Sequence, residues 1–172
     1  HPGPHQEQGG QVVKVLAIDP GPVVSGWVLF DSDAQRVLEA GKEDPTTGVL
    51  EFVRRGETPG GRGWEMVACE MIASYGMAVG AEVFETCVQI GRLMEVWEST
   101  TGGRVVRVKR QKAKLLLCQS SRAKDANVSQ ALKDRFGEVG TAKNPGPLFG
   151  VAKHAWAALA VAVFASEVGE GV

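Results

Sequence analysis

The chain has 172 residues, of which 44% are hydrophobic, and a formal net charge of −1 at pH 7. This length supports one sizeable hydrophobic core and is short for two domains, so we expect a single globular domain. No apolar run approaches the roughly 20 residues that a membrane-spanning helix needs, and no signal-peptide pattern opens the chain. We therefore predict a cytoplasmic protein with no membrane partner. Cys69, Cys87 and Cys118 lack CxxC spacing, which argues against a zinc site or a disulfide framework.

The first segment, HPGPHQEQGG, is polar and rich in Pro and Gly, so residues 1–11 are predicted to be a disordered lead or a tag remnant. The domain is predicted over residues 12–168. It begins with a β-branched run, QVVKVLAID, which predicts a strand ending at Asp19. A Pro/Gly turn leads into a second strand, WVLFD, and QRVLEAGKE is predicted to be a third, more exposed strand.

Helices and strands are predicted to alternate in the rest of the chain. TTGVLEFVRRG predicts a short helix, EMVACEMI a buried strand that carries Glu70 at or near its end, and RVVRVK a fifth strand. The segments around 111–118 and 124–136 are predicted to be helical. GVAKHAWAALAVAV, residues 150–163, predicts a buried helix because it is apolar nearly all round. This order of elements predicts a mixed α/β fold.

Residues 81–98 predict a long helix with a wide apolar surface. One stripe holds Val83, Cys87, Ile90, Met94 and Trp97, and Phe84, Val88 and Gly91 lie beside it. One face can cover the sheet. The remaining apolar surface of the helix is interpreted either as a contact with a second copy of the protein or as a sign of a deeply buried helix.

Two carboxylates, Asp19 and Glu70, are predicted at the ends of buried strands. A free carboxylate there costs solvation energy unless something positive meets it. Strand ends are where functional groups gather in open α/β sheets, and carboxylate oxygens are the hard ligands that Mg²⁺ or Mn²⁺ prefers. Taken singly, Asp19 is also explained as a turn-forming residue before Pro-Gly, and Glu70 as a strand-end residue that faces solvent.

The segment from Arg104 to Lys124 has a formal charge of +8 and no acidic residue. A solvated helix face usually alternates the signs of its charges, and this segment does not. One concentrated basic face in a nearly neutral protein is typical of a binder of phosphate backbones. The predicted DNA-binding residues of this basic segment are Arg104, Arg107, Lys109, Arg110, Lys112, Lys114, Arg122 and Lys124.

A family resemblance adds to these observations. VLAIDPGPVVSGWVLFD resembles the first motif of RuvC-type Holliday junction resolvases, in which an apolar strand ends in Asp-Pro-Gly and a later Gly opens the second strand. ACEMI is similar to that family's strand ending in a catalytic Glu, and AEVFETCVQIGRLMEV to its long helix. VVRVKRQKAKLLL resembles the fifth strand and basic helix, and KHAWAALAVAV the final helix. The resemblance runs from about Val12 to Phe164.

The resemblance implies an RNase H-like fold, in which helices flank a central mixed five-stranded sheet. It implies a homodimer that cuts four-way DNA junctions by metal-dependent phosphodiester hydrolysis, acting on the DNA of a bacterium or its virus. Asp19, Glu70 and His154 would be the catalytic residues, and they would hold Mg²⁺ or Mn²⁺ in a two-metal site. A hydrogen-bonded core histidine is the alternative interpretation of His154.

Ala157 departs from the family pattern, because an aspartate is expected three residues after His154. Residues three apart share a helix face, so Ala157 is predicted to mark a vacant ligand position. Natural divergence, an inactivating substitution and a catalytically silent junction-binding protein all remain open. An actin-like ATPase is disfavoured because the chain is too short for two lobes and has no second Gly-rich phosphate loop.

Two further regions are candidates for contacts with DNA. Tyr75 and Met77 lie on a Gly-flanked loop after Glu70, where an apolar or aromatic side chain can wedge between unstacked bases. Ordinary packing is the alternative for Tyr75. Lys153, next to His154, is interpreted as a solvated residue at the helix start or as a phosphate contact.

Overall fold

A mixed five-stranded sheet forms the centre of the computed structural model, which describes residues 13–170. The strands are β1 (Lys14–Asp19), β2 (Val24–Asp31), β3 (Arg36–Pro45), β4 (Met66–Met71) and β5 (Val105–Lys109), in the spatial order β3-β2-β1-β4-β5. β2 pairs antiparallel with β1 and β3, whereas β4 runs parallel to β1 and β5. The predicted mixed sheet is confirmed. The predicted lead, residues 1–11, lies outside the described residues.

The burial of each strand follows from its place in the sheet. β1 and β4 are interior parallel strands covered on both faces, which explains the continuous buried runs Val15–Ile18 and Val67–Cys69. β3 lies at one edge, and most of its residues are at least partly exposed, as predicted. The apolar runs of the sequence therefore mark the centre of the sheet.

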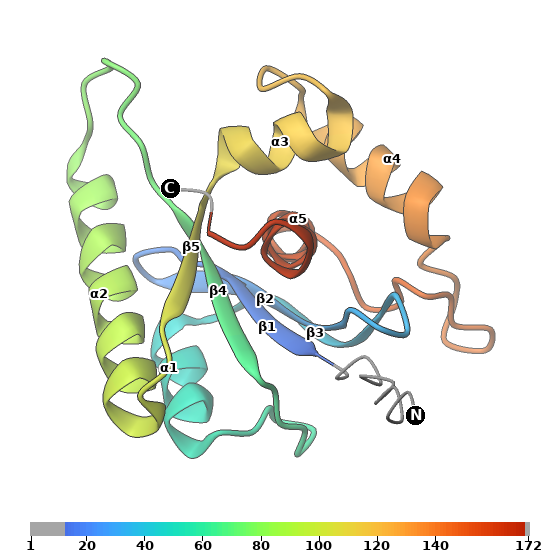
Figure 1. Cartoon of the computed structure of the whole chain (residues 1–172), viewed down its shortest axis with the longest axis horizontal. Coiled ribbons are helices and arrows are strands. Elements are labelled where there is room, and N and C mark those ends of the chain that lie inside the picture. Colours follow the sequence, from blue (N-terminus) through green and yellow to red (C-terminus); the bar gives the residue numbers. More distant parts are fainter. Residues whose placement is uncertain (1–12, 171–172) are drawn as a thin grey trace, which may run out of the picture.

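Helices cover both faces of the sheet (Figure 1). On one face lie α1 (Thr46–Arg55) and α2 (Ala81–Thr101), which share a core with β1 through side chains such as Leu16 and Ile18. On the other lie α3 (Arg110–Cys118), α4 (Asp125–Phe136) and α5 (Ala155–Glu167). α5 packs against the sheet and is covered in turn by α3 and α4, so that it is buried nearly all round, as its sequence predicts.

The α5 helix begins five residues later than the predicted start at residue 150. Gly150 and Lys153 have φ angles of 91° and 49°, in the left-handed region, which interrupts any regular helix there. The Lys153 ammonium lies 2.7 Å from a carboxylate oxygen of Glu43 at the end of the edge strand. His154 therefore occupies the N-cap position and not the first turn of the helix.

The core-facing side of α2 differs from the predicted stripe. Thr86, Ile90, Leu93 and Trp97 are its buried residues, whereas Cys87 is exposed. The predicted stripe is wrong at Cys87, because the helix is rotated to bury Thr86 in its place. All three cysteines are free thiols. Between residues 13 and 170 no helix combines the length and the apolarity needed to span a bilayer.

Candidate active site

Asp19 and Glu70 lie next to each other at the carboxyl ends of two neighbouring strands in the middle of the sheet. Asp19 is the last residue of β1 and Glu70 the penultimate residue of β4, and the parallel register Ile18↔Cys69 places their carboxyl groups on neighbouring strands. Their side chains are only 13% and 14% exposed. The interpretation of Glu70 as a solvent-facing residue is therefore wrong, and the sequence-predicted pair of carboxylates is brought together.

The two carboxyl groups share an electrostatic environment that disfavours double ionisation. Their strands are adjacent and parallel, and both side chains line the same cavity. Burial, followed by the negative charge of Asp19, raises the pKa of Glu70 to about 7. Burial also raises the pKa of Asp19 above its ordinary value. Two desolvated carboxylates of this kind are stabilised by a nearby positive charge.

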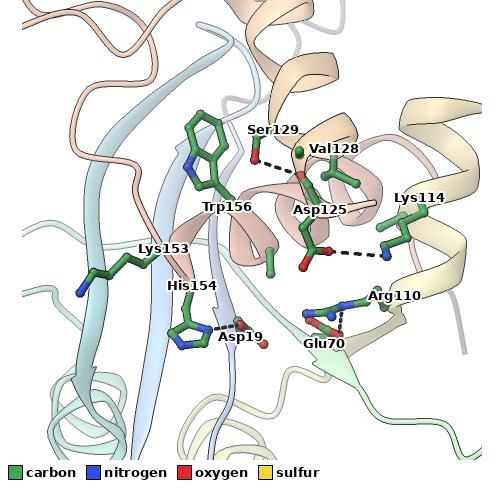
Figure 2. A pocket seen from close by; sticks show the side chains of 14 residues that line it. Asp19, Glu70, Arg110, Lys114, Asp125, Val128, Ser129, Lys153, His154 and Trp156 are labelled. Carbon is green, nitrogen blue, oxygen red and sulfur yellow. Dashed lines mark hydrogen bonds and ion pairs between the residues drawn. The ribbon is translucent and has the colours of Figure 1, made fainter. Parts of the chain in front are cut away.

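Arg110 supplies a positive charge at the same ends of the strands. It is the first residue of α3, directly after β5, and its Nε lies 2.9 Å from Oε1 of Glu70. Arg110 was predicted from the sequence to bind DNA, and its contact with Glu70 was not predicted. The available signal was its position immediately after a strand that pairs with β4. Figure 2 shows the guanidinium beside Glu70, with the ion pair of Asp125 and Lys114 above them in the view.

His154 extends the site from the opposite side. Its Nδ1 lies 3.3 Å from Oδ2 of Asp19, and its side chain is 52% exposed (Figure 2). The interpretation as a buried core histidine is therefore wrong. The backbone of His154 packs directly on Gly26 of β2, where a Cβ atom would lie 2.4 Å from the His154 carbonyl carbon. Gly26, the strand partner of Asp19, thus allows His154 to approach the carboxylates.

A cavity of about 220 Å³ opens beside these side chains. Ala157 lines it, one turn along α5 from His154, and supplies no ligand. Trp156, Val128 and Ala113 form part of its apolar wall, and Asp125 of α4 lies on its polar side. Asp125 is bound to Lys114 of α3 at 3.5 Å, a second ion pair in the site that the sequence analysis missed.

The residues present fit one divalent cation better than two. Mg²⁺ is commonly held by one or two carboxylates, with water and phosphate completing its shell, and Asp19 and Glu70 match that donor set. Within the described part of the chain no three His, Cys, Asp or Glu side chains are grouped closely enough to hold an ion. The guanidinium of Arg110 already contacts Glu70, and position 157 adds no carboxylate.

The basic segment runs from the edge strand β5 through α3 to the start of α4. Arg104, Lys112, Arg122 and Lys124 are exposed, as a phosphate-binding surface requires. Three members have acidic partners elsewhere in the chain: Arg107 pairs with Glu170 at 3.6 Å, Arg110 with Glu70 and Lys114 with Asp125. Lys114 is only 16% exposed, so it lies within the site and not on the outer surface.

The loop between β4 and α2 projects apolar side chains into solvent. Tyr75 is 53% exposed and Met77 is 76% exposed. The interpretation of Tyr75 as an ordinary packing residue is therefore wrong. Its backbone has a φ of 45°, in the left-handed region, which fixes the turn at the tip of the loop. Both side chains are available to a partner.

Comparison with solved structures identifies the architecture. A Thermus thermophilus RuvC structure superposes with a TM-score of 0.58 at 22% sequence identity, covering 91% of this chain and 96% of that one. The chain has the RuvC fold. T. thermophilus RuvC in complex with a Holliday junction substrate gives a TM-score of 0.63 at 17% identity, covering 90% and 93% of the two chains. The RNase H-like fold expected from the sequence is confirmed by these RuvC structures, whereas no protein-family model and no curated protein matches the chain.

Proposed function

We propose that this protein is a structure-selective endodeoxyribonuclease that resolves four-way DNA junctions by metal-dependent hydrolysis of phosphodiester bonds. The observation that carries the proposal is the largely buried pair of Asp19 and Glu70 at adjoining strand ends, with His154 beside them. The similar T. thermophilus RuvC structure contains a Holliday junction substrate, which supports branched DNA as the ligand of this fold.

Asp19 and Glu70 are the residues that would hold Mg²⁺ or Mn²⁺. When bound, such an ion activates water and neutralises charge on the phosphate. Asp19 also orients the imidazole: when Nδ1–H of His154 donates to Asp19, Nε2 is left to accept a proton. Once protonated, Nε2 would donate to the scissile phosphate. Hydrolysis adds the hydroxyl of water to phosphorus and a proton to the departing sugar oxygen, leaving a phosphate monoester and a free hydroxyl.

A four-way junction would need a surface that binds phosphates and a dimer with two-fold symmetry. The basic segment would bind phosphates, with Lys153 as a further contact, and Tyr75 and Met77 would insert at the junction. A symmetric junction requires two cuts, so we propose a homodimer with two identical sites. We propose that the protein acts in the cytoplasm, on the DNA of a bacterium or its virus.

A catalytically silent junction-binding protein is the second candidate function. The observation that favours it is Ala157, which lines the cavity next to His154 and provides no ligand. A silent protein would keep the basic segment and the exposed loop, because these features serve binding alone. The two candidate functions therefore predict the same affinity for four-way junctions, and only the nuclease hydrolyses the DNA.

A gel assay with a synthetic four-way junction separates the two candidates. We expect the wild-type protein to cut the junction with Mn²⁺ or Mg²⁺ and not with EDTA. Asp19→Asn should bind the junction with unchanged affinity and lose cutting. Asp31→Asn is the matched control, because Asp31 ends β2 at the end of the strand pair that is opposite Asp19, and it accepts hydrogen bonds from the turn that follows.

The results of this assay distinguish the nuclease from the silent junction-binding protein. Binding without cutting under either ion would identify the silent protein. A folded Asp19→Asn variant that cuts as fast as wild type would show that the carboxylate pair is not the active site.

A further inference from the structure

The Arg110 guanidinium is a fixed positive charge inside the proposed active site. Its Nε donates to Glu70 at 2.9 Å, and the residue lines the same cavity as Asp19, Ala157 and Asp125. A guanidinium does not lose its proton in proteins, so this charge is present whenever the protein is folded. Any cation that joins the two carboxylates must share the site with Arg110.

The charges of the site balance with one divalent ion. Asp19, Glu70 and Asp125 contribute three negative charges, and Arg110 and Lys114 contribute two positive charges. Lys153 also lines the cavity, but its charge is balanced by Glu43, which lies 2.7 Å from its ammonium. A phosphodiester adds one more negative charge, which leaves an excess of two. One divalent ion neutralises that excess, whereas two ions would leave an equally large positive excess and find no further carboxylate at position 157.

We propose that this site operates with one divalent cation, and that the Arg110 guanidinium provides the second positive charge at the scissile phosphate. The inference rests on the proposed nuclease function. It replaces the two-metal arrangement expected from the family resemblance with an ion and an arginine.

The exposure of Arg110 fits a role at the phosphate better than a purely structural ion pair. Its side chain is 46% exposed, although Glu70 beneath it is only 14% exposed. A guanidinium has five N–H donors in a planar fork, so a bond from Nε to Glu70 leaves the terminal nitrogens for phosphate oxygens. As water attacks phosphorus and the bond to the sugar oxygen breaks, these donors would stabilise the developing negative charge.

Asp125 offers the main alternative for a second ion. It lies on the polar side of the cavity and its side chain is 80% exposed. The ammonium of Lys114 lies 3.5 Å from its carboxylate and already provides the positive charge there. A second ion at Asp125 would have to displace Lys114.

Titration of the intact protein with Mn²⁺, followed by electron paramagnetic resonance without DNA, tests the proposal. We expect one ion per protomer. Arg110→Gln should bind Mn²⁺ about tenfold more tightly, because a competing positive charge is removed from Glu70. The same variant should cut a four-way junction about 100-fold more slowly at saturating Mn²⁺, because a donor to the phosphate is lost.

Two further variants control the titration. Arg110→Lys keeps the positive charge, so we expect it to retain the Mn²⁺ affinity of wild type and to recover part of the cutting. Arg135→Gln removes a comparable ion pair, that of Arg135 with Glu167, from a position that does not line the cavity. It should change neither Mn²⁺ affinity nor cutting.

Two results would overturn the proposal while leaving a nuclease in place. The first is the binding of two Mn²⁺ ions by the wild-type protein, with the second ion lost in Asp125→Asn. The second is undiminished cutting by Arg110→Gln at saturating Mn²⁺. A wild-type protein that cuts no junction with any ion would instead refute the proposed function, and with it the role of Arg110 at the phosphate.

Discussion

Gly26 determines how closely His154 approaches Asp19. A Cβ atom at position 26 would lie 2.4 to 2.6 Å from the carbonyl carbon, Cβ and oxygen of His154, distances at which the backbone must shift. We predict that Gly26→Ala destabilises the fold by about 1–3 kcal/mol, as overpacking of a close contact does. It should also move the imidazole away from Asp19. Denaturant unfolding and the NMR chemical shifts of His154 measure the two effects.

Gly48→Ala is the matched control for this prediction. Gly48 lies in α1, and a Cβ atom there would meet nothing within 4 Å. The substitution should be neutral, or should stabilise the protein by roughly 0.5–1 kcal/mol because alanine is the better helix former. Equal effects at the two positions would contradict the proposed contact between Gly26 and His154.

Glu70 makes the stability of the metal-free protein depend on pH. Its pKa rises from an ordinary value of 4.5 to about 7, so the folded state holds this proton more tightly than the unfolded state. The resulting stability is fully present below pH 4.5 and is lost as the pH rises through 7. The raised pKa of Asp19 acts in the same direction.

We therefore predict that, in EDTA, the melting temperature falls by several degrees between pH 5 and pH 8. Glu70→Gln should flatten this dependence, because the amide does not titrate. Thermal unfolding of both proteins across this range provides the measurement. An unchanged pH dependence in Glu70→Gln would show that another group is responsible.

At the residue level, the sequence was sufficient to predict Asp19, Glu70 and His154 as a group. The two acids end apolar runs that become adjacent strands, and the resemblance to the RuvC pattern implied that His154 lies with them. The pairing of Arg110 with Glu70 was not predictable from the basic pattern alone, because all eight basic residues of that segment look alike in sequence. Only the register between β4 and β5 distinguishes Arg110 from its neighbours.

At the level of elements, α2 presents an apolar stripe to solvent. Phe84 is 61% exposed and Val88 is 55% exposed, and they lie one turn apart on the helix. The interpretation of α2 as a deeply buried helix is therefore wrong. This exposed stripe supports the proposed contact with a second copy of the protein.

We predict that Phe84→Glu combined with Val88→Glu converts a dimer into a monomer, because four carboxylates would meet across a two-fold interface. Sedimentation at micromolar concentration measures the oligomeric state. Ser99→Glu combined with Thr100→Glu adds the same charge near the other end of α2 and should leave the dimer intact. A wild-type monomer, both free and bound to DNA, would exclude this assignment of the stripe.

The basic segment gives a second prediction at this level. Replacing the exposed residues Lys112, Arg122 and Lys124 with Gln should weaken junction binding, and each lost phosphate contact should lower the log–log salt slope by about 0.9. Binding measured at several salt concentrations tests this. Replacement of Arg36, Arg55 and Lys143, which are exposed outside the segment, should have a smaller effect. Equal slopes in both triple variants would place the DNA surface elsewhere.

Most elements were predictable because their apolar patterns match their burial. The start of α5 was not, because its apolar run begins before the helix does. Lys153 has a left-handed backbone, and its ion pair with Glu43 joins it to the distant edge strand, a contact that the local sequence does not show. The orientation of α2 was also missed, since Thr86 does not stand out as a core residue in the sequence.

In the whole molecule, the basic segment passes through the proposed active site. Arg110 lies on Glu70, and the segment continues along α3 to the exposed residues before α4. A phosphate backbone bound along this segment would therefore lead into the carboxylate pair. The net charge of −1 conceals this arrangement, because the acids that balance the segment lie elsewhere in the sequence.

Cleavage of a supercoiled plasmid that extrudes a cruciform tests the central claim most directly. A dimer with two sites should cut opposing strands of the four-way junction and release linear DNA, provided that Mn²⁺ or Mg²⁺ is present. The same plasmid without the inverted repeat should remain supercoiled. Equal cutting of both plasmids, or no cutting of either one, would contradict a metal-dependent nuclease selective for junctions.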